Sequence, residues 1–424
     1  MVNKSFFRIS YENLAKFSFV VYFANPFFIS FFSLFKISNT VSVLLTLLMI
    51  YIPLFTLFFL DSKKYLKADF AILYIFLILF FGITWLFHPE YTPYYLKREY
   101  GVWDTVFFPT HGIYTYLFVR LMDTPEKILK NVKISGYLMF FYFLNEIYLY
   151  TQRGFWYGVA GNNGQAKMGY SVLFGYQVLF FLITFLYCSF KYKKKSEIAI
   201  TLGFFIMLFI GGSRGPVIFI VAFVIIYWVL DFLKHNKFLK YKKRIMGFFI
   251  SSYILYYFKN NILIFISRQL NLVGFSSRFV DKLLHGTISS DSGRSVIWEK
   301  TVEMIKQNPF GYGGMGSRHF LTEIIFAGYP HSFVLEILAD FGIFFGGMIL
   351  ILFLINTLIM LFDKKREEWS GVFLIFLSSS FCLFLSLSYW NNNTFWGTIG
   401  IVMNCWLHLR KKRDYRSFSL KLGD

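Results

Sequence analysis

Residues 333–362 read FVLEILADFGIFFGGMILILFLINTLIMLF. The stretch is longer than the ~20 mostly apolar residues that a helix needs to cross a hydrocarbon core of about 30 Å. Its apolar residues run continuously, whereas the strands of a membrane β-barrel alternate over about ten residues. The sequence therefore predicts a membrane-spanning helix here, with two carboxylates, Glu336 and Asp340, near its start.

The composition extends this prediction to the whole chain. Of the 424 residues, 56% are hydrophobic and 16% are charged, whereas a soluble domain is about 25% charged. A water-soluble enzyme, a disordered chain and a disulfide scaffold are therefore excluded. The three cysteines, Cys188, Cys382 and Cys405, lie inside apolar stretches, without the spacing of a disulfide framework or a metal site.

Several further stretches are long and apolar enough to be spanning helices. We expect an all-α, polytopic integral membrane protein with about 12 transmembrane helices and one large external loop that contains short helices. The chain would form a single membrane domain over residues 1–424. The predicted spans are 17–35, 41–60, 70–87, 103–122, 134–151, 169–190, 198–212, 216–233, 246–258, 333–362, 370–390 and 394–409.

The positive charges indicate an orientation. The chain has 43 Lys and Arg against 23 Asp and Glu, and an excess of positive charge marks the cytoplasmic loops of membrane proteins. With a cytoplasmic N-terminus, every basic cluster falls on the cytoplasmic side. We therefore predict two cytoplasmic termini and no nucleic-acid partner. The clusters are Lys63 to Lys67, Lys127 to Lys133, Lys191 to Lys195, Lys234 to Arg244, Lys364 to Arg366 and Arg410 to Arg413.

Residues 259–332 form a hydrophilic external loop between two predicted spans. The loop is far longer than a connection between neighbouring helices requires. Functional residues are commonly found on loops that a rigid scaffold positions. We therefore expect the functional site at this outer face of the membrane.

Arg214 interrupts two apolar spans within the motif GGSRGP at residues 211–216. Glycines let the backbone bend and present its amide donors, and a guanidinium binds phosphate through two hydrogen bonds. The motif is therefore typical of an anion site. An arginine that caps a helix and extends to the membrane interface is an equally good interpretation.

A second arginine, Arg294, lies in the first turn of a predicted amphipathic helix. Apolar residues between Ile297 and Ile305 share one face of this helix. Asp291 or Ser292 would cap it, and Pro309 would end it. Backbone donors, the helix dipole and the guanidinium together would form an anion-binding site. The alternative is a surface helix with a solvated arginine.

The motif NPFGYGGMG at residues 308–316 holds four glycines. Such a segment lets the backbone approach a ligand closely, or it serves as a flexible tether.

His331 immediately precedes the span that begins at residue 333. An imidazole with a pKa near neutrality can take a proton from a hydroxyl group. Ser332, Glu336 and Asp340 follow at intervals of four residues and share one helix face. The two carboxylates need cationic partners, and a structural histidine is the alternative interpretation. The candidate partners are Arg214, Arg278, Arg294 and Arg318.

Common catalytic motifs are missing from the sequence. It contains no Walker loop, Asp-x-Asp, His-Glu-x-x-His or Gly-x-Ser-x-Gly motif. The seven histidines show no metal-ligand spacing. We therefore expect neither a metal ion nor a cofactor.

Taken in order, these motifs resemble the bacterial O-antigen polymerase and O-antigen ligase superfamily, which holds the Wzy-type polymerases and the WaaL-type ligases. The resemblance covers residues 210–345, which would be the catalytic module. Ser332 departs from the family pattern, because many members have Asn after the histidine. The matching positions are Ser213-Arg214-Gly215, Arg294 with Trp298, Asn308 to Gly313, and His331 with Leu335, Glu336, Asp340 and Gly342.

The resemblance implies an inverting, metal-independent glycosyltransferase of the GT-C type in the bacterial cytoplasmic membrane, with its site facing outward. His331 would deprotonate the acceptor hydroxyl, while Arg214 and Arg294 would bind the diphosphate of an undecaprenyl-linked oligosaccharide. Membrane lipids and a chain-length regulator are the other candidate partners. The candidate substrate-binding residues are Arg278, Arg318, Glu336, Arg153, Trp298 and Tyr312.

Four functions are compatible with these residues. We predict a polysaccharide polymerase, which transfers the glycan to a second lipid-linked repeat unit of an O-antigen or capsule. An O-antigen ligase would transfer it to lipid A-core and shares the same motifs. A lipid-linked glycan flippase would need charges along a path through several spans. A peptidoglycan glycosyltransferase of the SEDS type would need an acidic signature in the external loop, for which Asp281 and Asp291 are candidates.

Overall fold

The computed structural model describes residues 11–98, 100–160, 164–235, 257–272, 293–322 and 328–421, together with the isolated positions 253, 280, 283, 284 and 324. Helices dominate these residues, and one antiparallel hairpin joins β1 (Trp156–Ala160) to β2 (Gly164–Met168). The expected all-α, polytopic membrane architecture is confirmed. Arg278 and most of the segment 236–292 lie outside the described residues.

The helices of the first half are α1 (Tyr11–Phe23), α2 (Asn25–Leu34), α3 (Asn39–Leu60), α4 (Ser62–Tyr65), α5 (Ala68–Phe87), α6 (Thr92–Tyr95), α7 (Ile113–Leu121), α8 (Pro125–Arg153), α9 (Val172–Tyr192) and α10 (Lys195–Ile210). Those of the second half are α11 (Arg214–His235), α13 (Lys259–Leu272), α15 (Arg294–Gln307), α16 (Ser317–Leu321), α17 (Phe333–Phe362), α18 (Glu367–Ser380) and α19 (Asn393–Lys421). Short turns of other helix types are η1 (Pro89–Tyr91), η2 (Trp103–Phe107), η3 (Lys364–Arg366) and η4 (Phe381–Phe384).

Within the described residues, six helical segments are long and apolar enough to cross a membrane. The pair α1 and α2, bent by 77° at Ala24, makes a seventh candidate. The six are α3, α5, α9, residues 214–233 of α11, α17, and the segment Lys364–Phe384 that contains α18.

The other predicted spans differ from the structure in identifiable ways. A continuous helix over 103–122 is wrong, because a π-helical turn and an irregular segment at 108–112 precede the short α7. The spans at 134–151, 198–212 and 394–409 lie in α8, α10 and α19, of which α8 and α19 are longer and more polar than expected. The span at 246–258 falls almost entirely outside the described residues.

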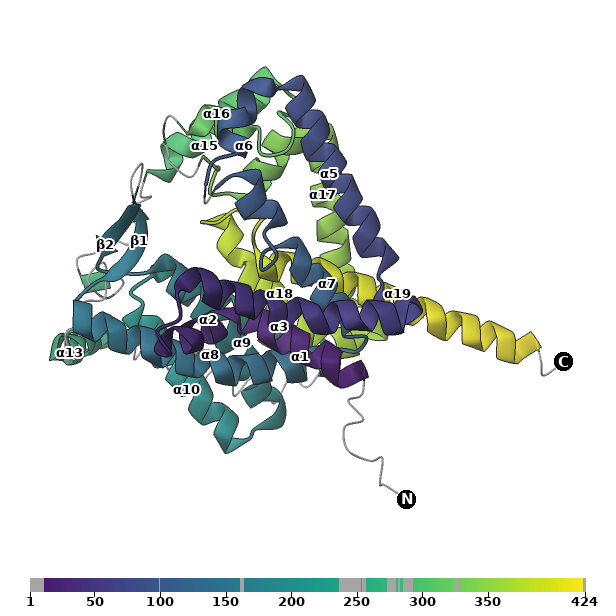
Figure 1. Cartoon of the computed structure of the whole chain (residues 1–424). Coiled ribbons are helices and arrows are strands. Elements are labelled where there is room, and N and C mark those ends of the chain that lie inside the picture. The colour runs from purple at the N-terminus through teal and green to yellow at the C-terminus, as the bar shows by residue number, and fades with distance from the viewer. Residues whose placement is uncertain are drawn as a thin grey trace.

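The helices form an inner set and an outer set. The segments over 172–192 and 364–384 are largely buried inside the protein, whereas α3, α5 and α17 expose most of their apolar side chains. An apolar surface of this kind is compatible with lipid, which solvates it as well as protein does. In Figure 1, α5 and α17 extend from the main bundle toward α6, α15 and α16, and α19 projects beyond the bundle at its C-terminal end.

One end of the bundle gathers basic side chains, and we call it the basic end. Arg120, at the end of α7, donates from Nε to Asp69 of α5 at 2.7 Å, and it also contacts Asn404 of α19. Lys127, in the first turn of α8, lies 3.4 Å from Glu12 of α1. These polar contacts hold the short, buried α7 between its neighbours.

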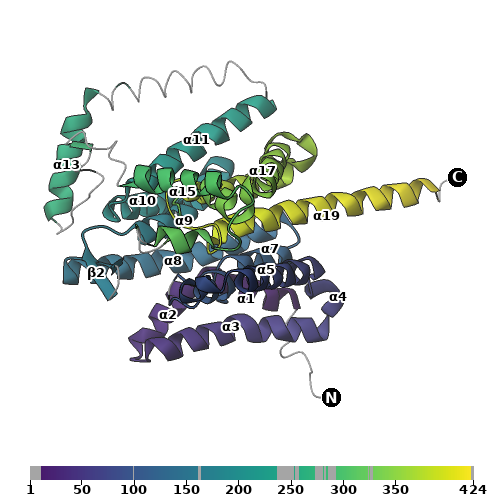
Figure 2. The same ribbon diagram turned by 90° about the horizontal axis from the view of Figure 1, so that it is seen from above.

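Several helices begin at the opposite end, which we call the site end. The Ser171 backbone N–H, before α9, donates to the Gly211 carbonyl, before α11, at 3.1 Å. The Asn393 side chain, at the start of α19, donates to the Thr110 carbonyl, before α7, at 3.4 Å. Figure 2, seen from above, shows α9, α11, α15 and α17 on one side of α1 and α3.

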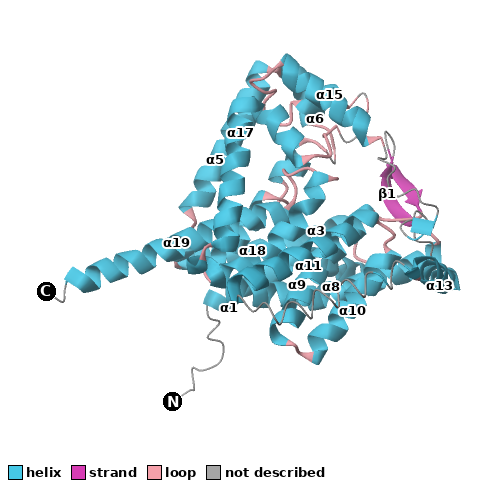
Figure 3. Cartoon of the chain, turned by 180° about the vertical axis from the view of Figure 1, so that it is seen from behind, coloured by secondary structure: helices cyan, strands magenta, loops and turns pink. Residues whose placement is uncertain are grey.

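The same helices end at the basic end. Lys191 of α9, Asp231 of α11 and Glu367 of α18 line one polar cavity. The first turns of α7, α9, α11 and α19 therefore share one end of the bundle, and their last turns share the other. Figure 3 shows from behind how α5 and α17 reach α6 and α15.

The helix α17 breaks at Gly342, where φ is 76° and ψ is 174°. The loop that follows α15 supplies the missing backbone partners. The Tyr312 N–H donates to the Ala339 carbonyl at 2.8 Å, and the Ile343 N–H donates to the Pro309 carbonyl at 2.8 Å. The glycine-rich motif at 308–316 thus approaches the backbone of α17, a role that differs from the ligand loop or tether considered from the sequence.

This approach leaves no space for a side chain at Gly342. A Cβ atom there would lie 2.4 Å from the Phe310 carbonyl carbon, and a left-handed φ already costs a non-glycine residue of order 1–3 kcal/mol. We expect Gly342→Ala to lower the free energy of unfolding by at least about 1–3 kcal/mol, measured by thermal unfolding of the purified protein in detergent.

The matched control is Gly347→Ala in the same helix, where a Cβ atom would meet nothing within 4 Å. Alanine is the better helix former, so this variant should unfold at an equal or slightly higher temperature. Equal unfolding temperatures for the two variants would contradict the close packing of the 308–316 motif against Gly342.

Candidate functional site

The site is built on a tight corner between α10 and α11. The helix α10 ends at Ile210, Gly212 takes a left-handed φ of 67°, and α11 begins at Arg214. The first turns of α9 pack against this corner so closely that a Cβ atom on Gly175 would lie 3.1 Å from Pro216 Cγ. The motif at 211–216 therefore fixes the position and direction of Arg214.

Tyr176 of α9 brings the two predicted anion-binding arginines together. Its hydroxyl lies against the backbone of Gly215, where a Cβ atom would be only 2.7 Å away. The charges of Arg294 and Arg214 both act on this hydroxyl. Each arginine is the first residue of its helix, α11 or α15. Two positive charges and two positive helix ends therefore act on one region, which favours binding of an anion such as a diphosphate.

His331 joins this region from the segment before α17. Its backbone φ is 54°, a conformation that is uncommon for a residue with a side chain and is often found at functional sites. Its ring contacts the ring of Tyr329, with centroids 4.5 Å apart. The ring contact and the backbone conformation hold the imidazole in place.

The imidazole of His331 is neutral at neutral pH. Burial, and next the positive charge of Arg294, lower the pKa of His331 to about 4. Its Nδ1 atom is buried without a hydrogen-bond partner among the described residues. A neutral ring with an unoccupied nitrogen is the form that can accept a proton.

Arg318 and Glu336 belong to a buried polar network rather than to the open site. Arg318 donates to the Tyr100 carbonyl and, at 3.5 Å, to the Ser388 hydroxyl. That hydroxyl donates to the Glu336 carboxylate at 2.5 Å. Of the predicted cationic partners of the two carboxylates, Arg318 has a charge that acts on both Glu336 and Asp340.

Asp340 anchors the same network to the segment that precedes α19. Its carboxylate accepts from the Tyr389 hydroxyl at 2.8 Å and from the Trp390 indole N–H at 2.9 Å. Both carboxylates of α17 therefore fasten the 388–390 segment to the start of α17. Their described partners are protein groups, which favours a structural role for Glu336 over the substrate-binding role predicted from the sequence.

The helix α15 matches its prediction in part. It ends at Gln307, before Pro309, and it buries Ile297 and Ile305 as expected. Its first turn differs, because Gly293, with φ 80°, takes the N-cap position without a side-chain hydrogen bond. The expected caps, Asp291 and Ser292, lie outside the described residues.

The two predicted aromatic ligands lie in different environments. The Trp298 indole nitrogen, one turn after Arg294, is buried without a partner among the described residues, so it can donate to a ligand. Tyr312 is buried, and its hydroxyl donates to the Met304 carbonyl at 2.9 Å. The described contacts of Tyr312 therefore stabilise the packing of α15.

Arg153 lies apart from this group, at the end of α8. Its guanidinium stacks over the Tyr157 ring, 5.0 Å from the centroid. Arg153 and Glu146 line a cavity of about 190 Å³ beside the hairpin. The structure thus places Arg153 in a separate cavity from His331, and Arg278 lies outside the described residues.

An apolar cavity of about 670 Å³ opens beside the start of α17. It extends from Phe333, two residues after His331, to Phe362 at the other end of the helix. Its walls come from α11, α17 and the segment from α18 to η4. A long hydrocarbon chain could lie in this cavity with its polar end near His331.

Residues 199–350 match the family model described as O-antigen ligase. The match supports the O-antigen polymerase and ligase superfamily. The matched segment contains Arg214, Arg294 and His331, and the resemblance seen in the sequence is confirmed. Searches of curated proteins and of solved structures give no significant match.

The family match also supports a coarse function. It indicates a glycosyltransferase-like membrane enzyme with a glycan-transfer role of the polymerase or ligase type, which acts on lipid-linked oligosaccharides. Within the described part of the chain, no three His, Cys, Asp or Glu side chains are grouped to hold a metal ion.

Three further residues of this superfamily-type site were not singled out from the sequence: Tyr176, Tyr329 and Ser388. Tyr329 precedes His331 by two residues, which is the one sequence signal that could have found it. Tyr176 and Ser388 lie far along the chain from the motifs they contact. Their roles depend on the packing of α9 and of the segment before α19.

The role of Glu336 can be tested by stability. Removing its carboxylate leaves Arg318 buried without that counter-charge, so Glu336→Ala should lower the free energy of unfolding by about 3–5 kcal/mol. The control is Glu303→Ala on α15, whose side chain is 55% exposed and should change stability by less than about 0.5 kcal/mol. Thermal unfolding in detergent measures both, and an unchanged unfolding temperature for Glu336→Ala would show that Glu336 does not stabilise the network.

Proposed function

We propose that the protein is a polysaccharide polymerase that transfers a glycan from undecaprenyl diphosphate to a hydroxyl of a second lipid-linked repeat unit. The observation that carries the proposal is that the charges of Arg214 and Arg294 both act on Tyr176, and that the charge of Arg294 also acts on the neutral His331. Two fixed cations and one free base are the groups that displacement of a diphosphate by a hydroxyl needs.

The transfer takes place in one displacement. The acceptor oxygen forms a bond to the anomeric carbon while the bond from that carbon to the diphosphate oxygen breaks. The proton of the acceptor hydroxyl goes to a ring nitrogen of His331. The electron pair of the broken bond leaves on undecaprenyl diphosphate, whose added negative charge Arg214 and Arg294 stabilise. A single displacement inverts the anomeric configuration.

Donor binding would strengthen the base. The charge of Arg294 contributes to the low pKa of His331. A bound diphosphate offsets that charge and favours the imidazolium form. We therefore infer that His331 becomes more basic when the donor is in place, so proton transfer follows donor binding.

The arrangement of the helices supports an outward-facing site. Positive charge gathers at the basic end, and the site lies at the other end of the same helices. Since basic residues favour the cytoplasmic side, we place the site at the outer leaflet of the bacterial cytoplasmic membrane, with both termini inside. The apolar cavity beside Phe333 would hold the polyprenyl chain.

A transporter is the less favoured function. It would need charged groups along a path through the spans. The two carboxylates of α17, Glu336 and Asp340, are instead fully buried in a network with Arg318 and the 388–390 segment. A ligase shares all the site residues, so it is distinguished from the polymerase by the product.

The catalytic residues can be tested in a deletion strain by measuring the lengths of surface glycan and of the undecaprenyl-linked pool. We expect His331→Ala to abolish product, and Arg294→Lys to lower it severely because a lysine does not reproduce the bidentate guanidinium. Single repeat units in place of long chains support a polymerase, whereas long chains that stay on the lipid carrier indicate a ligase.

Two substitutions elsewhere serve as matched controls. His88→Ala removes a histidine that pairs with Glu90 at the surface, and Arg268→Lys changes an exposed arginine of α13. Both should leave the glycan pattern unchanged. Normal chain lengths from His331→Ala and Arg294→Lys, at equal protein levels, would overturn the proposed site.

The pH dependence provides an independent test of the base. Activity is lost as the pH falls through the pKa of His331, because the protonated ring cannot accept a proton. In the free enzyme this pKa is about 4, so the acidic limb of kcat/KM should lie well below the 6.5 of an unperturbed histidine. The acidic limb of kcat reports the pKa of His331 in the donor complex. Because the bound diphosphate raises that pKa, this limb should lie at higher pH than the limb of kcat/KM.

Transfer assays on purified protein, from about one pH unit below the pKa of His331 up to neutral pH, measure both limbs. In Arg294→Gln the limb of kcat/KM should move to higher pH, because the charge that disfavours protonation of His331 is gone. An acidic limb of kcat/KM that is unaffected by Arg294→Gln would contradict the coupling.

A further inference from the structure

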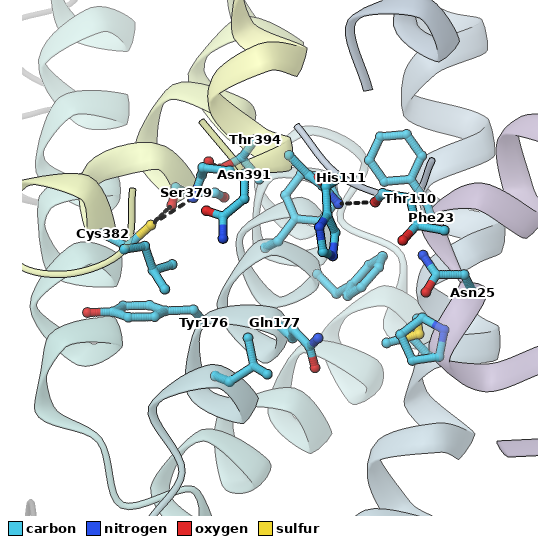
Figure 4. Close-up of a pocket in the computed structure, with 18 of the residues that line it drawn as sticks. Phe23, Asn25, Thr110, His111, Tyr176, Gln177, Ser379, Cys382, Asn391 and Thr394 are labelled. Atoms are coloured by element: carbon cyan, nitrogen blue, oxygen red, sulfur yellow. Dashed lines mark hydrogen bonds between the residues drawn. The ribbon is translucent and has the colours of Figure 1, made fainter. Parts of the chain in front are cut away.

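Another cavity lies where three interruptions of helical structure meet at the site end. Its walls include Asn25, at the bend between α1 and α2, and Thr110 and His111, before α7. The segment 387–394, before and at the start of α19, forms another wall, and the first turns of α9 complete it. Figure 4 shows Gln177, Asn391 and His111 around the cavity. Irregular backbone at membrane depth is tolerated where it lines a cavity of this kind.

The lining of this cavity is polar, and the described residues that form it include no Lys, Arg, Asp or Glu. Amide and hydroxyl groups alternate with aromatic rings, among them Tyr22, Phe23 and Tyr176. Amides offer donors and acceptors together, and aromatic faces give flat apolar contact. The polar lining residues are Asn25, Thr110, His111, Gln177, Ser379, Asn391, Asn392, Asn393 and Thr394.

Part of this polar lining is already used by the protein. Asn392 accepts from the Thr394 hydroxyl at 2.8 Å and from the Phe395 N–H at 2.8 Å, so it shapes the wall. In contrast, the side chains of Gln177 and Asn391 make no hydrogen bond within the described residues. The Asn393 Oδ1 atom is buried and also lacks a partner there. Buried polar groups are normally paired, so a polar ligand would satisfy the Asn393 oxygen, and the half-buried amides of Gln177 and Asn391 offer it further donors and acceptors.

The cavity is joined directly to the site of transfer. Tyr176 lines it, its hydroxyl lies against the backbone of Gly215, and the charges of Arg214 and Arg294 act on that hydroxyl. Leu387 lines it too, and its backbone N–H donates to the hydroxyl oxygen of Tyr329, the residue whose ring contacts His331. The cavity therefore adjoins the residues around the base and the arginines.

We propose that this cavity binds a neutral sugar ring of the acceptor beside the site of transfer. The inference rests on the proposed transferase function. In the proposed function, Arg214 and Arg294 bind the diphosphate of the donor, and the apolar cavity beside Phe333 binds its lipid. A neutral acceptor sugar has no charge for the arginines to bind, so it needs a different site. The volume of about 250 Å³ lies just below the roughly 300–1,000 Å³ of small-molecule sites, which limits the ligand to about one ring.

The test uses the full-length protein in detergent and the glycan released by mild acid from the host's own polyprenyl diphosphate pool. Saturation-transfer NMR should detect binding of this glycan to the wild type. Gln177→Leu and Asn391→Leu each remove hydrogen bonds to the sugar, so the affinity should fall about tenfold in each. Gln177→Ala, which removes a half-buried side chain without adding a branched one, should give the same loss if a leucine disturbs folding.

Two control variants test whether loss of glycan binding is specific to the cavity. Asn356→Leu removes an amide of α17 that bonds to Leu352 and Trp406, away from the cavity, and should bind the glycan like the wild type. His331→Ala should also keep the affinity while losing transfer. Binding of farnesyl diphosphate, followed by phosphorus NMR, should be unchanged by the cavity variants.

The outcomes distinguish the two proposals. Equal glycan affinity in the wild type and the cavity variants, or no binding by the wild type, would overturn the acceptor site even if transfer is observed. Cavity-dependent binding by a wild-type protein that transfers no glycan in vesicles would overturn the proposed function and leave the sugar site intact. Displacement of the glycan by farnesyl diphosphate would place the sugar on the arginines and would also overturn the acceptor site.

Discussion

Backbone hydrogen bonds are the constraint on which this structure depends, because a chain in hydrocarbon has no water to satisfy them. Interruptions of the helices therefore have to be paired within the protein. They are collected at the site end: the bend at Ala24, the corner at Gly212, the break at Gly342 and the segment before α19. Each brings backbone and polar side chains together where straight helices would offer apolar faces. The candidate site and the amide-lined cavity both result from this concentration.

Buried charged side chains fix the helices relative to one another at both ends of the bundle. At the basic end, Arg120 with Asp69 and Asn404 fixes α5, α7 and α19. At the site end, Arg318, Glu336 and Asp340 fix the start of α17 to the 388–390 segment. A buried charge is tolerated when protein groups satisfy it. These charged residues differ from Arg214, Arg294 and His331, to which we assign the transfer.

Much of this could be predicted from sequence, and the limits have physical reasons. The arginines, the histidine and the end of α15 follow from local patterns of charge, apolar residues and proline. Glu336 and Tyr312 were assigned to the substrate from their motif, yet their partners, Ser388 and the Met304 carbonyl, are set by packing. The broken helix over 103–122 escaped prediction because hydropathy measures apolar content and does not detect the irregular turn before α7.

The sequence by itself determined that this protein lies in lipid, that it is helical and which residue types are available for chemistry. Insertion of a helix into lipid depends on the composition of about 20 consecutive residues, which can be read directly from the sequence. Only the tertiary structure decided which of those residues meet. Tyr176 packs against the backbone beside Arg214 and feels the charge of Arg294, and Tyr329 contacts His331 near the amide-lined cavity, which brings together segments that are separated along the chain. Such contacts depend on the packing angles of whole helices, which no local pattern specifies.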